Sequence, residues 1–258
     1  MRLKDKVILV TGSTTGIGAS MARRFVAEGA KVILHGRDAE RGKAICAELG
    51  EDRSAFVQGD LAQADFPEAL AIAAVAAFGR LDALVNNAAL TTRARIQETD
   101  AAFFDRMVAV NLRAPMMLIR ALLPALEKSK GCVLNIGSIL AHCGQANLLA
   151  YSVTKGGLMT MTRNLSHSLG PVQVRVNQVN VGWTLTENEY QVKLGDGLPA
   201  DWPEHLPAYA APFGRLLSPE DIAAAAVYWV GDESFPVSGT VAELEQYPLI
   251  GRIPDQEG

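Results

Sequence analysis

Short apolar runs alternate with longer segments of helical periodicity along most of this chain. Continuous apolar runs of about four to eight residues, rich in β-branched side chains, are typical of strands buried on both faces. Six such runs predict β-strands, at residues 6–11, 31–35, 55–58, 83–86, 131–136 and 172–179. Because helix-like segments separate these strands, the pattern predicts an α/β fold: one parallel, doubly wound sheet with helices on both faces.

Two of the predicted helices carry specific signals. Ile17, Met21 and Phe25 repeat every four positions and form the apolar stripe of an amphipathic helix. Ser218, followed by Pro219 and two acidic residues, is typical of a capped helix start, where acids lie at the positive end of the helix dipole. These signals predict where the two helices begin.

The segment from Trp183 to Phe213 differs from the rest of the chain. It contains prolines at positions 199, 203, 207 and 212, and its apolar residues show little periodicity. Irregular segments of this length in compact proteins often cover a ligand site. Residues 183–213 are therefore predicted to form a mobile substrate lid on a single domain that spans residues 1–258.

Composition and charge narrow the possible partners. The 258 residues are 49% hydrophobic, which is enough to bury the core of one domain. A net charge of -4 without any basic run argues against nucleic acid and anionic membranes as partners. The sequence shows no apolar stretch of transmembrane length and no signal-peptide pattern at its start, so we expect a cytoplasmic protein.

The cysteines and histidines show no metal-ligand spacing. The three cysteines lack a C-x-x-C arrangement and are predicted to be reduced thiols: Cys46, Cys132 and Cys143. The four histidines are equally scattered, at positions 35, 142, 167 and 205. No metal site is predicted.

Tyr151 and Lys155 lie four positions apart, which places both side chains on one face of a helix. A phenol normally titrates near pH 10, but a neighbouring ammonium group stabilises its phenolate and makes it a better proton shuttle. Ser138 precedes this pair and follows a strand, so its hydroxyl could bind a substrate oxygen beside the phenol. The three residues together indicate carbonyl or alcohol redox chemistry.

Two further motifs follow predicted strands. The glycine-rich run Thr11-Gly12-Ser13-Thr14-Thr15-Gly16-Ile17-Gly18 comes after the first strand, and Asn86-Asn87-Ala88-Ala89 lies at the end of the fourth. In their order and spacing, all these motifs resemble the pattern of the short-chain dehydrogenase/reductase family: T-G-x-x-x-G-x-G, N-N-A-G, Ser and Y-x-x-x-K. The resemblance covers about residues 5 to 185. It implies a Rossmann fold and an NAD(P)-dependent oxidoreductase that interconverts a secondary alcohol and a ketone.

The resemblance also implies a dinucleotide site at the carboxyl ends of the strands. The glycine turn and the next helix N-terminus would receive the pyrophosphate. Asp60 and Leu61 would meet the adenine, and Asn87 would hold that end of the site together. The full set of expected cofactor-binding residues is Gly12, Ser13, Thr15, Gly16, Ile17, Gly18, Arg37, Asp60, Leu61, Asn87, Ala88, Tyr151, Lys155, Gly182, Thr184 and Thr186.

The end of the second strand bears on the choice of dinucleotide. An acid at that position would bind the ribose 2′-OH of NAD, whereas an arginine can bind the 2′-phosphate of NADP. Here Gly36 takes the place of the acid and Arg37 follows it. The sequence therefore favours NADP over NAD, although Thr15 stands where many NADP-using relatives carry a second basic residue.

Four residues match the catalytic positions of the family. Tyr151 would act as general acid in ketone reduction and as general base in alcohol oxidation. Lys155 would lower its pKa, and Ser138 would orient the substrate oxygen. Asn111 matches the asparagine that supports a water chain to the lysine; alternatively, it bends its helix locally.

The chain departs from the family pattern in three places. Val181-Gly182 replaces a Pro-Gly pair, and Ala89 replaces a glycine, which could narrow the pocket floor. Residues 238–248 replace the usual glycine-rich, Asp-containing strand, a region that often contacts a neighbouring subunit. The expected homotetramer or homodimer therefore rests on family habit alone.

Positions that should face the substrate by analogy carry mostly hydrogen-bonding groups: Ser138, His142, Gln145, Asn147, Tyr151 and Trp183, with Asn180 and Glu187 nearby. Such a lining favours a small hydroxylated substrate, such as a sugar or polyol, over a steroid or a long acyl chain. His142 could equally be a solvated loop residue, and Gln145 and Asn147 are good turn formers. The alternatives are a ketoester or 3-oxoacyl-type carbonyl reductase and a non-catalytic dinucleotide-binding regulatory protein.

Overall fold

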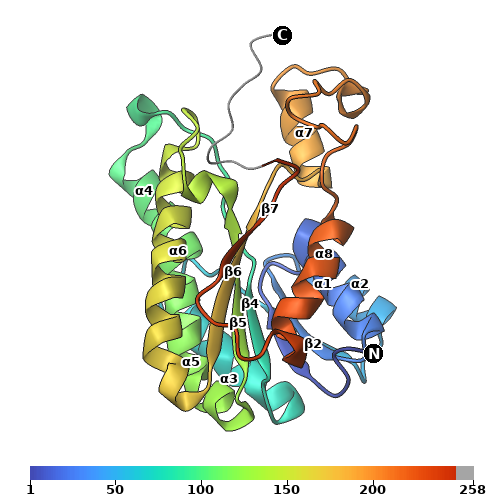
Figure 1. Ribbon diagram of the computed structural model, residues 1–258, viewed down its shortest axis with the longest axis vertical. Helices are drawn as coiled ribbons and strands as arrows, with labels where there is room; N and C mark the ends of the chain where they lie inside the picture. Colours follow the sequence, from blue (N-terminus) through green and yellow to red (C-terminus); the bar gives the residue numbers. More distant parts are fainter. Residues whose placement is uncertain (248–258) are drawn as a thin grey trace.

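The computed structural model describes residues 1–247 and confirms the predicted parallel sheet (Figure 1). Within these residues the sheet has the strand order β3-β2-β1-β4-β5-β6-β7. All neighbouring strands pair in parallel. The strands are β1 (Val7–Val10), β2 (Lys31–Gly36), β3 (Ser54–Gln58), β4 (Ala83–Asn86), β5 (Cys132–Ser138), β6 (Arg175–Val181) and β7 (Val241–Leu244).

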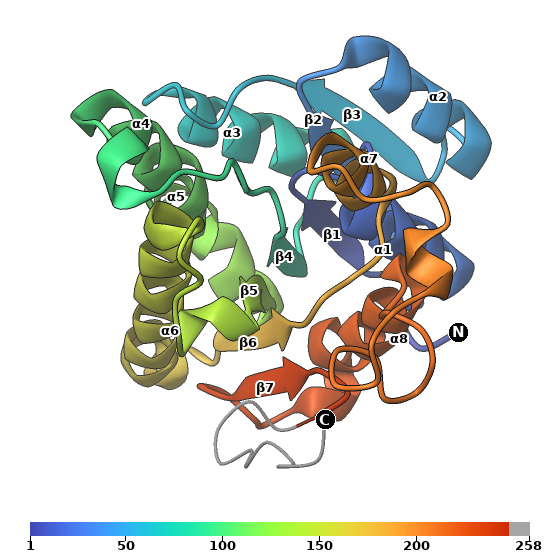
Figure 2. The same cartoon turned by 90° about the horizontal axis from the view of Figure 1, so that it is seen from above.

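Helices cover both faces of the sheet, which completes the doubly wound arrangement. One face carries α1 (Gly16–Ala27), α2 (Ala39–Leu49) and α8 (Pro219–Val230) (Figure 2). The other face carries α3 (Phe66–Phe78), α4 (Ala101–Val108), α5 (Ala114–Ser129) and α6 (Leu149–Leu169). The strand order reverses between β1 and β4, and ligands of such sheets bind outside the carboxyl ends of the strands at that point.

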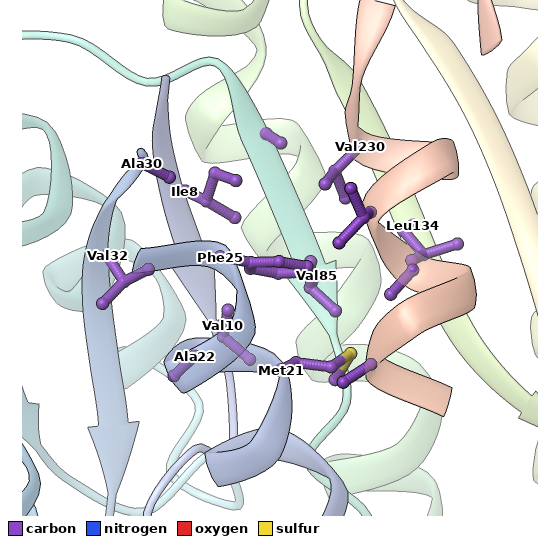
Figure 3. Close-up of a cluster of buried hydrophobic side chains, with 14 of the residues drawn as sticks. Ile8, Val10, Met21, Ala22, Phe25, Ala30, Val32, Val85, Leu134 and Val230 are labelled. Atoms are coloured by element: carbon purple, nitrogen blue, oxygen red, sulfur yellow. The ribbon is translucent and has the colours of Figure 1, made fainter. Parts of the chain in front are cut away.

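The predicted stripe on α1 is confirmed by its burial. Met21 and Phe25 are fully buried, and Ile17 packs against the same core. Figure 3 shows Met21 and Phe25 between strand residues such as Val85 and the α8 residue Val230. Burying each of these large side chains contributes about 1.5–3 kcal/mol, so the stripe holds α1 and its glycine turn firmly on the sheet.

The predicted start of α8 is confirmed in detail. The Ser218 hydroxyl accepts a hydrogen bond of 3.2 Å from the Asp221 backbone N–H, and Asp221 Oδ2 accepts one of 2.8 Å from the Ser218 N–H. Pro219 occupies the first turn. This reciprocal capping box satisfies backbone donors that the helix itself leaves without partners.

Two strand predictions need correction. β6 begins at Arg175 rather than at residue 172, because Gly170–Val172 forms a 3-10 turn and Gln173 has a φ of 61°. Residues 241–244, where no strand was predicted, form β7 beside β6. Within the segment that departs from the family pattern, Pro248 lies outside the described residues.

The segment predicted as a lid is more ordered than its proline content suggested. It contains α7 (Glu187–Gly195) and a 3-10 turn at Trp202–Glu204. Trp202 is 3% exposed and packs with Ala211 and Leu216, and its ring stacks on that of Trp183 at a centroid distance of 5.7 Å. A small hydrophobic core of its own therefore organises this part of the chain.

One helical run passes the length and apolarity criteria for a membrane span, contrary to the reading of the sequence. It comprises α4, a π-helical turn η2 (Ala109–Arg113) and α5, and it covers Ala101–Ser129. Half of its most apolar stretch of 18 residues is buried inside the fold, where α5 packs against α3. The apolar residues of α5 serve this packing, which is the behaviour of a core helix.

Candidate active site

The sequence motifs meet at a cleft of about 750 Å³ above the carboxyl ends of β1, β2, β4 and β5. Thirteen of the sixteen expected cofactor-binding residues line it; Ser13, Gly182 and Thr184 do not. Residues that were not predicted for the cofactor also line it: Thr14, His35, Gly36, Arg41, Ala89, Leu90, Thr91, Thr92, Val110, Ile136, Gly137, Val181, Glu187, Asn188 and Gln191.

The glycine turn is fitted closely to the loop after β4. Gly12 has a φ of 63°, and a Cβ there would lie 2.8 Å from the Ala88 Cα. A Cβ on Gly18 would lie only 2.2 Å from the Gly12 carbonyl oxygen and 2.5 Å from the Asn87 amide nitrogen. The Asn87 amide donates hydrogen bonds of 2.9 and 3.1 Å to the carbonyls of Thr11 and Gly12. Asn87 thus fixes the turn, as the resemblance implied.

His35 supports the same turn from β2, a role that the sequence did not reveal. Burial lowers the pKa of His35 to about 4, so its ring is neutral at physiological pH. A neutral ring has one donor and one acceptor. His35 Nδ1 accepts a hydrogen bond of 3.3 Å from the Gly12 N–H, and its Nε2 lies 3.3 Å from the Gly59 carbonyl, to which it donates. The ring thereby joins β1, β2 and the end of β3.

Two arginines face the far end of the cleft. Arg37 lies at the end of β2, and Arg41 lies in the first turn of α2. Asp38 caps α2 by accepting a 3.0 Å hydrogen bond from the Arg41 backbone N–H, and its second oxygen is 3.4 Å from the Arg41 guanidinium. The helix cap therefore positions a second basic side chain, Arg41, at the same cleft, although Thr15 in the glycine turn is not basic.

Tyr151 and Lys155 both lie on α6 and line the cleft, as their spacing predicted. Lys155 Nζ donates a hydrogen bond of 2.7 Å to the Ile136 carbonyl and lies 5.5 Å from the centre of the Tyr151 ring. Ser138 ends β5 and is hydrogen-bonded to the Tyr151 hydroxyl. Tyr151 and Lys155 thus line the same part of the cleft, and Ser138 lies directly beside Tyr151 without lining the cleft itself.

The electrostatics of this group differ from the expectation. Burial raises the pKa of Tyr151 to about 12, and the hydrogen bond with Ser138 opposes this shift. Burial also lowers the pKa of Lys155 to about 8. Desolvation disfavours both charged forms, and the group that lowers the tyrosine pKa in this structure is Ser138 rather than the lysine that was expected to do so.

The shift of Lys155 predicts a change of stability with pH. Between pH 8 and 10.5 the unfolded chain binds a proton at this lysine that the folded chain does not, so the free energy of unfolding should rise with pH. The rise amounts to about 3 kcal/mol over the full window. Lys155→Met should abolish it, which urea unfolding at several pH values would measure. Parallel curves for the two proteins would contradict the assignment.

Asn111 occupies the π-helical turn between α4 and α5. Its amide accepts a hydrogen bond of 2.8 Å from the Leu90 N–H and donates one of 2.9 Å to the Leu90 carbonyl. It also donates one of 3.2 Å to the Thr154 hydroxyl on α6. The side chain therefore ties the loop after β4 to the helix that carries Tyr151, and the irregular turn agrees with the alternative that Asn111 distorts its helix.

The segment after β6 is fixed by hydrogen bonds, although Val181 stands where the family pattern has a proline. The Gly182 N–H donates a hydrogen bond of 2.8 Å to the Leu244 carbonyl, and the Thr184 hydroxyl donates one of 3.1 Å to the Gly182 carbonyl. Thr186 lines the cleft and caps α7 by accepting a 3.1 Å bond from the Glu189 N–H. Thr186 is thus placed where it can contact a bound nucleotide.

The residues expected at the substrate have varied surroundings. Gln145 is exposed, and the side-chain oxygen of Asn147 is buried without a hydrogen-bond partner among residues 1–247. The Trp183 indole N–H donates a 3.0 Å bond to Glu189, and its ring stacks on that of Trp202. His142 contacts Asn180 and Glu243. Of the residues expected to face the substrate, Tyr151 lines the cleft itself, as does the nearby Glu187, whereas Ser138, His142, Gln145, Asn147 and Trp183 do not.

The shape of the cleft fits a dinucleotide. Glycines leave the backbone of the turn bare beside the N-terminus of α1, which is the arrangement that accepts a pyrophosphate. Tyr151 and Lys155 line the other end of the same cleft, and Ser138 lies beside Tyr151. Within residues 1–247, no cluster of three or more histidine, cysteine or acidic side chains could hold a metal ion. Fold and cleft together define a dinucleotide-binding oxidoreductase.

Comparison with known proteins names the family. The model of the short chain dehydrogenases matches residues 6–195. L-fucose dehydrogenase of Mus musculus is 35% identical over 91% of this chain and 85% of its own length. 2-(S)-hydroxypropyl-CoM dehydrogenase 3 of Xanthobacter autotrophicus is 35% identical over 95% of this chain and 96% of its own length.

Solved structures agree with this match. A short chain dehydrogenase/reductase family protein superposes with a TM-score of 0.83 at 33% identity, covering 95% of this chain and 97% of that one. A 3-ketoacyl-(acyl-carrier-protein) reductase from Brucella melitensis, solved with NADH, gives 0.82 at 30% identity, covering 94% and 97%. The chain belongs to the short-chain dehydrogenase/reductase family. It is an NAD(P)-dependent oxidoreductase that interconverts a secondary alcohol and a ketone.

Proposed function

We propose that this enzyme is an NADP-preferring dehydrogenase of a small polyhydroxylated substrate, such as a sugar or polyol, and that Tyr151 transfers the proton. The convergence of Tyr151, Ser138 and Lys155 at one end of the dinucleotide cleft carries this proposal. The L-fucose dehydrogenases among its relatives support the substrate class.

Each of the three side chains has a defined task in the proposed mechanism. The Ser138 hydroxyl holds the substrate oxygen beside the Tyr151 hydroxyl. In ketone reduction Tyr151 donates its proton to that oxygen, and in alcohol oxidation it removes the proton from the substrate hydroxyl. Lys155, when protonated, stabilises the resulting phenolate. The nicotinamide, when bound, donates or accepts the hydride.

The proposed preference for NADP rests on two arginines. Gly36 leaves no carboxylate at the end of β2, while Arg37 and Arg41 face the cleft there. A 2′-phosphate could accept hydrogen bonds from both guanidinium groups, which are well suited to phosphate geometry. Asp38 offsets part of the Arg41 charge at 3.4 Å, so Arg37 should contribute more than Arg41.

Removing either arginine should therefore weaken the binding of NADPH more than the binding of NADH. Arg37→Ala is expected to weaken NADPH binding by about 10- to 100-fold, because a charge-assisted hydrogen bond is lost. NADH affinity should change by less than about 3-fold, since it lacks the phosphate. Titration calorimetry would measure both, with Arg163→Ala on the exposed side of α6 as a matched control. Equal losses for the two nucleotides would remove the basis for the preference.

The substrate class is tested by a panel of alcohols and ketones. Wild-type enzyme is assayed with sugars, polyols, ketoesters and cyclic monoalcohols, each with NADP and with NAD. The proposal expects the highest kcat/KM with a polyhydroxylated substrate. A highest kcat/KM with a ketoester would favour the reductase alternative, which agrees with the structural likeness to the 3-ketoacyl reductase.

Location and assembly complete the proposal. We propose a cytoplasmic enzyme that forms a homotetramer or homodimer with no nucleic-acid or membrane partner. Apolar side chains on the outer faces of α5 and α6 support self-association: Met116 is 46% exposed and Val153 50% exposed. Light scattering coupled to gel filtration would give the mass, and a monomer at micromolar concentration would reject the assembly.

A further inference from the structure

A chain of polar side chains crosses the buried interior of the sheet and has no task in the mechanism above. It starts at Asn86 on β4 and continues through Asn135, Thr162 and Gln178 to Asn180 on β6. Successive donor–acceptor distances are 2.9, 2.8, 3.0 and 2.7 Å. Buried polar groups are costly unless they are paired, and paired members of a network hold one another in a fixed geometry. Among residues 1–247, the only atom of this network without a partner is Asn86 Oδ1, at the end far from Asn180. The chain therefore holds whatever stands at its end in a defined position.

The end of this network is a pair formed by His142 and Glu243. His142 follows the short 3-10 helix η3 (Ile139–Ala141) after Ser138, and its Nε2 lies 3.2 Å from the Asn180 amide. The same Nε2 lies 3.0 Å from Glu243 Oε1 on β7. The two side chains are 16% and 32% exposed, so a ligand can reach them.

Strand register places this pair beside the reacting group. Gly137 on β5, Asn180 on β6 and Glu243 on β7 stand side by side at the carboxyl edge of the sheet. A Cβ on Gly137 would lie 2.1 Å from the Asn180 side-chain oxygen, so the glycine provides the space that the network occupies. Gly137 also lines the cleft and directly precedes Ser138. The pair and the substrate-orienting hydroxyl thus share one edge.

The proton arrangement leaves two polar atoms free. A carboxylate accepts a hydrogen bond, so the Glu243 contact holds the imidazole N–H at Nε2 of His142. The amides of Asn180 and Gln178 can both turn to match this: Asn180 then presents its oxygen to His142, and Gln178 donates to the Thr162 hydroxyl. His142 Nδ1 and Glu243 Oε2 make no hydrogen bond with residues 1–247.

We propose that His142 binds a second hydroxyl of the substrate, next to the CH–OH group that reacts, and that Glu243 positions His142 for this contact. A hydroxyl is both donor and acceptor, so it can donate to Nδ1 and receive further bonds from water or protein. The inference rests on the proposed function, because it explains how this chain would prefer a polyhydroxylated substrate over a simple alcohol. His142 is thus the specificity-determining residue, and Glu243 is its positioning residue.

The test compares two substrates that differ by one hydroxyl. Cyclohexanol and trans-1,2-cyclohexanediol are assayed with NADP and wild-type enzyme, His142→Ala and Glu243→Gln. Wild type should favour the diol in kcat/KM. His142→Ala should lower kcat/KM for the diol by about 10- to 100-fold, mainly through KM, while cyclohexanol changes by less than about 3-fold. Glu243→Gln should lower it by a smaller factor, because its amide oxygen still accepts a hydrogen bond from Nε2–H but its NH₂ group no longer fixes that tautomer. The preference for the diol should disappear in His142→Ala and weaken in Glu243→Gln.

Controls separate this role from a structural one. His167→Ala removes an exposed histidine from the outer part of α6 and should change neither substrate. NADPH affinity and thermal unfolding show whether each variant is folded, and Glu243→Gln retains shape if His142→Ala does not fold. Equal losses with both substrates would overturn the inference but leave the proposed function standing. A wild type that favours cyclohexanol over the diol would overturn both.

Discussion

Tyr151→Phe should lower kcat by about 10³-fold, because general acid–base catalysis contributes about 10² to 10⁴ and phenylalanine has no proton to transfer. The phenol is the group that Ser138 contacts at the cleft. Because the substitution removes one oxygen and keeps the ring, the packing of α6 should persist. Initial rates of nicotinamide reduction, with an alcohol in excess, would measure the loss.

The pH dependence of wild-type turnover is a second test of proton transfer by Tyr151. Burial raises the pKa of Tyr151 to about 12, so the phenol is protonated at neutral pH. Alcohol oxidation needs the unprotonated form of Tyr151, so kcat for oxidation should rise with pH. Carbonyl reduction needs the protonated form, so kcat for reduction should not rise with pH.

The NADPH affinity of Tyr151→Phe should stay within about 3-fold of wild type, which separates a loss of catalysis from a loss of cofactor binding. A variant with normal turnover would disprove the assignment.

Gly18→Ala should weaken NADPH binding by about 10- to 100-fold, because overpacking costs about 1–3 kcal/mol. The added Cβ would lie 2.2 Å from the Gly12 carbonyl oxygen and 2.5 Å from the Asn87 amide. Either the glycine turn moves off the loop after β4 or α1 shifts on the sheet. Both movements disturb the backbone donors that a pyrophosphate would use.

Gly195→Ala is the matched control for this substitution. Gly195 is the last residue of α7, and a Cβ there would meet nothing within 4 Å. This variant should bind NADPH like wild type and unfold at the same or a slightly higher temperature. Calorimetric titration of both variants tests the contrast. Equal affinities for Gly18→Ala and wild type would show that the turn is looser than its contacts indicate.

The sequence predicted those parts of the fold that depend on local pattern. Met21 and Phe25 are buried where their periodicity placed them, and Ser218 caps its helix as its neighbours indicated. The strand β7 escaped notice because Glu243, like Glu245 just after it, interrupts an apolar run. Its place in the sheet depends on pairing with β6, a contact that no local pattern records.

The candidate site, too, was predictable from the sequence only where a local pattern places its residues. The spacing of Tyr151 and Lys155 was enough to place both on one helix face. Their pKa values were not predictable, because the direction depends on burial that only the packed structure reveals. His35 and Arg41 were missed for a similar reason: each enters the site through a fold-dependent contact, with Gly12 in one case and Asp38 in the other.

Product formation by the wild-type enzyme tests the central claim most directly. Purified protein is first shown to bind NADP, and the same sample is then incubated with NADP and a polyhydroxylated alcohol while the reduced nicotinamide is followed by absorbance and the organic product is identified. We expect one equivalent of ketone for each reduced nicotinamide, over many turnovers. Tight nucleotide binding without turnover of any alcohol or ketone would contradict the proposed catalytic role of Tyr151, Ser138 and Lys155.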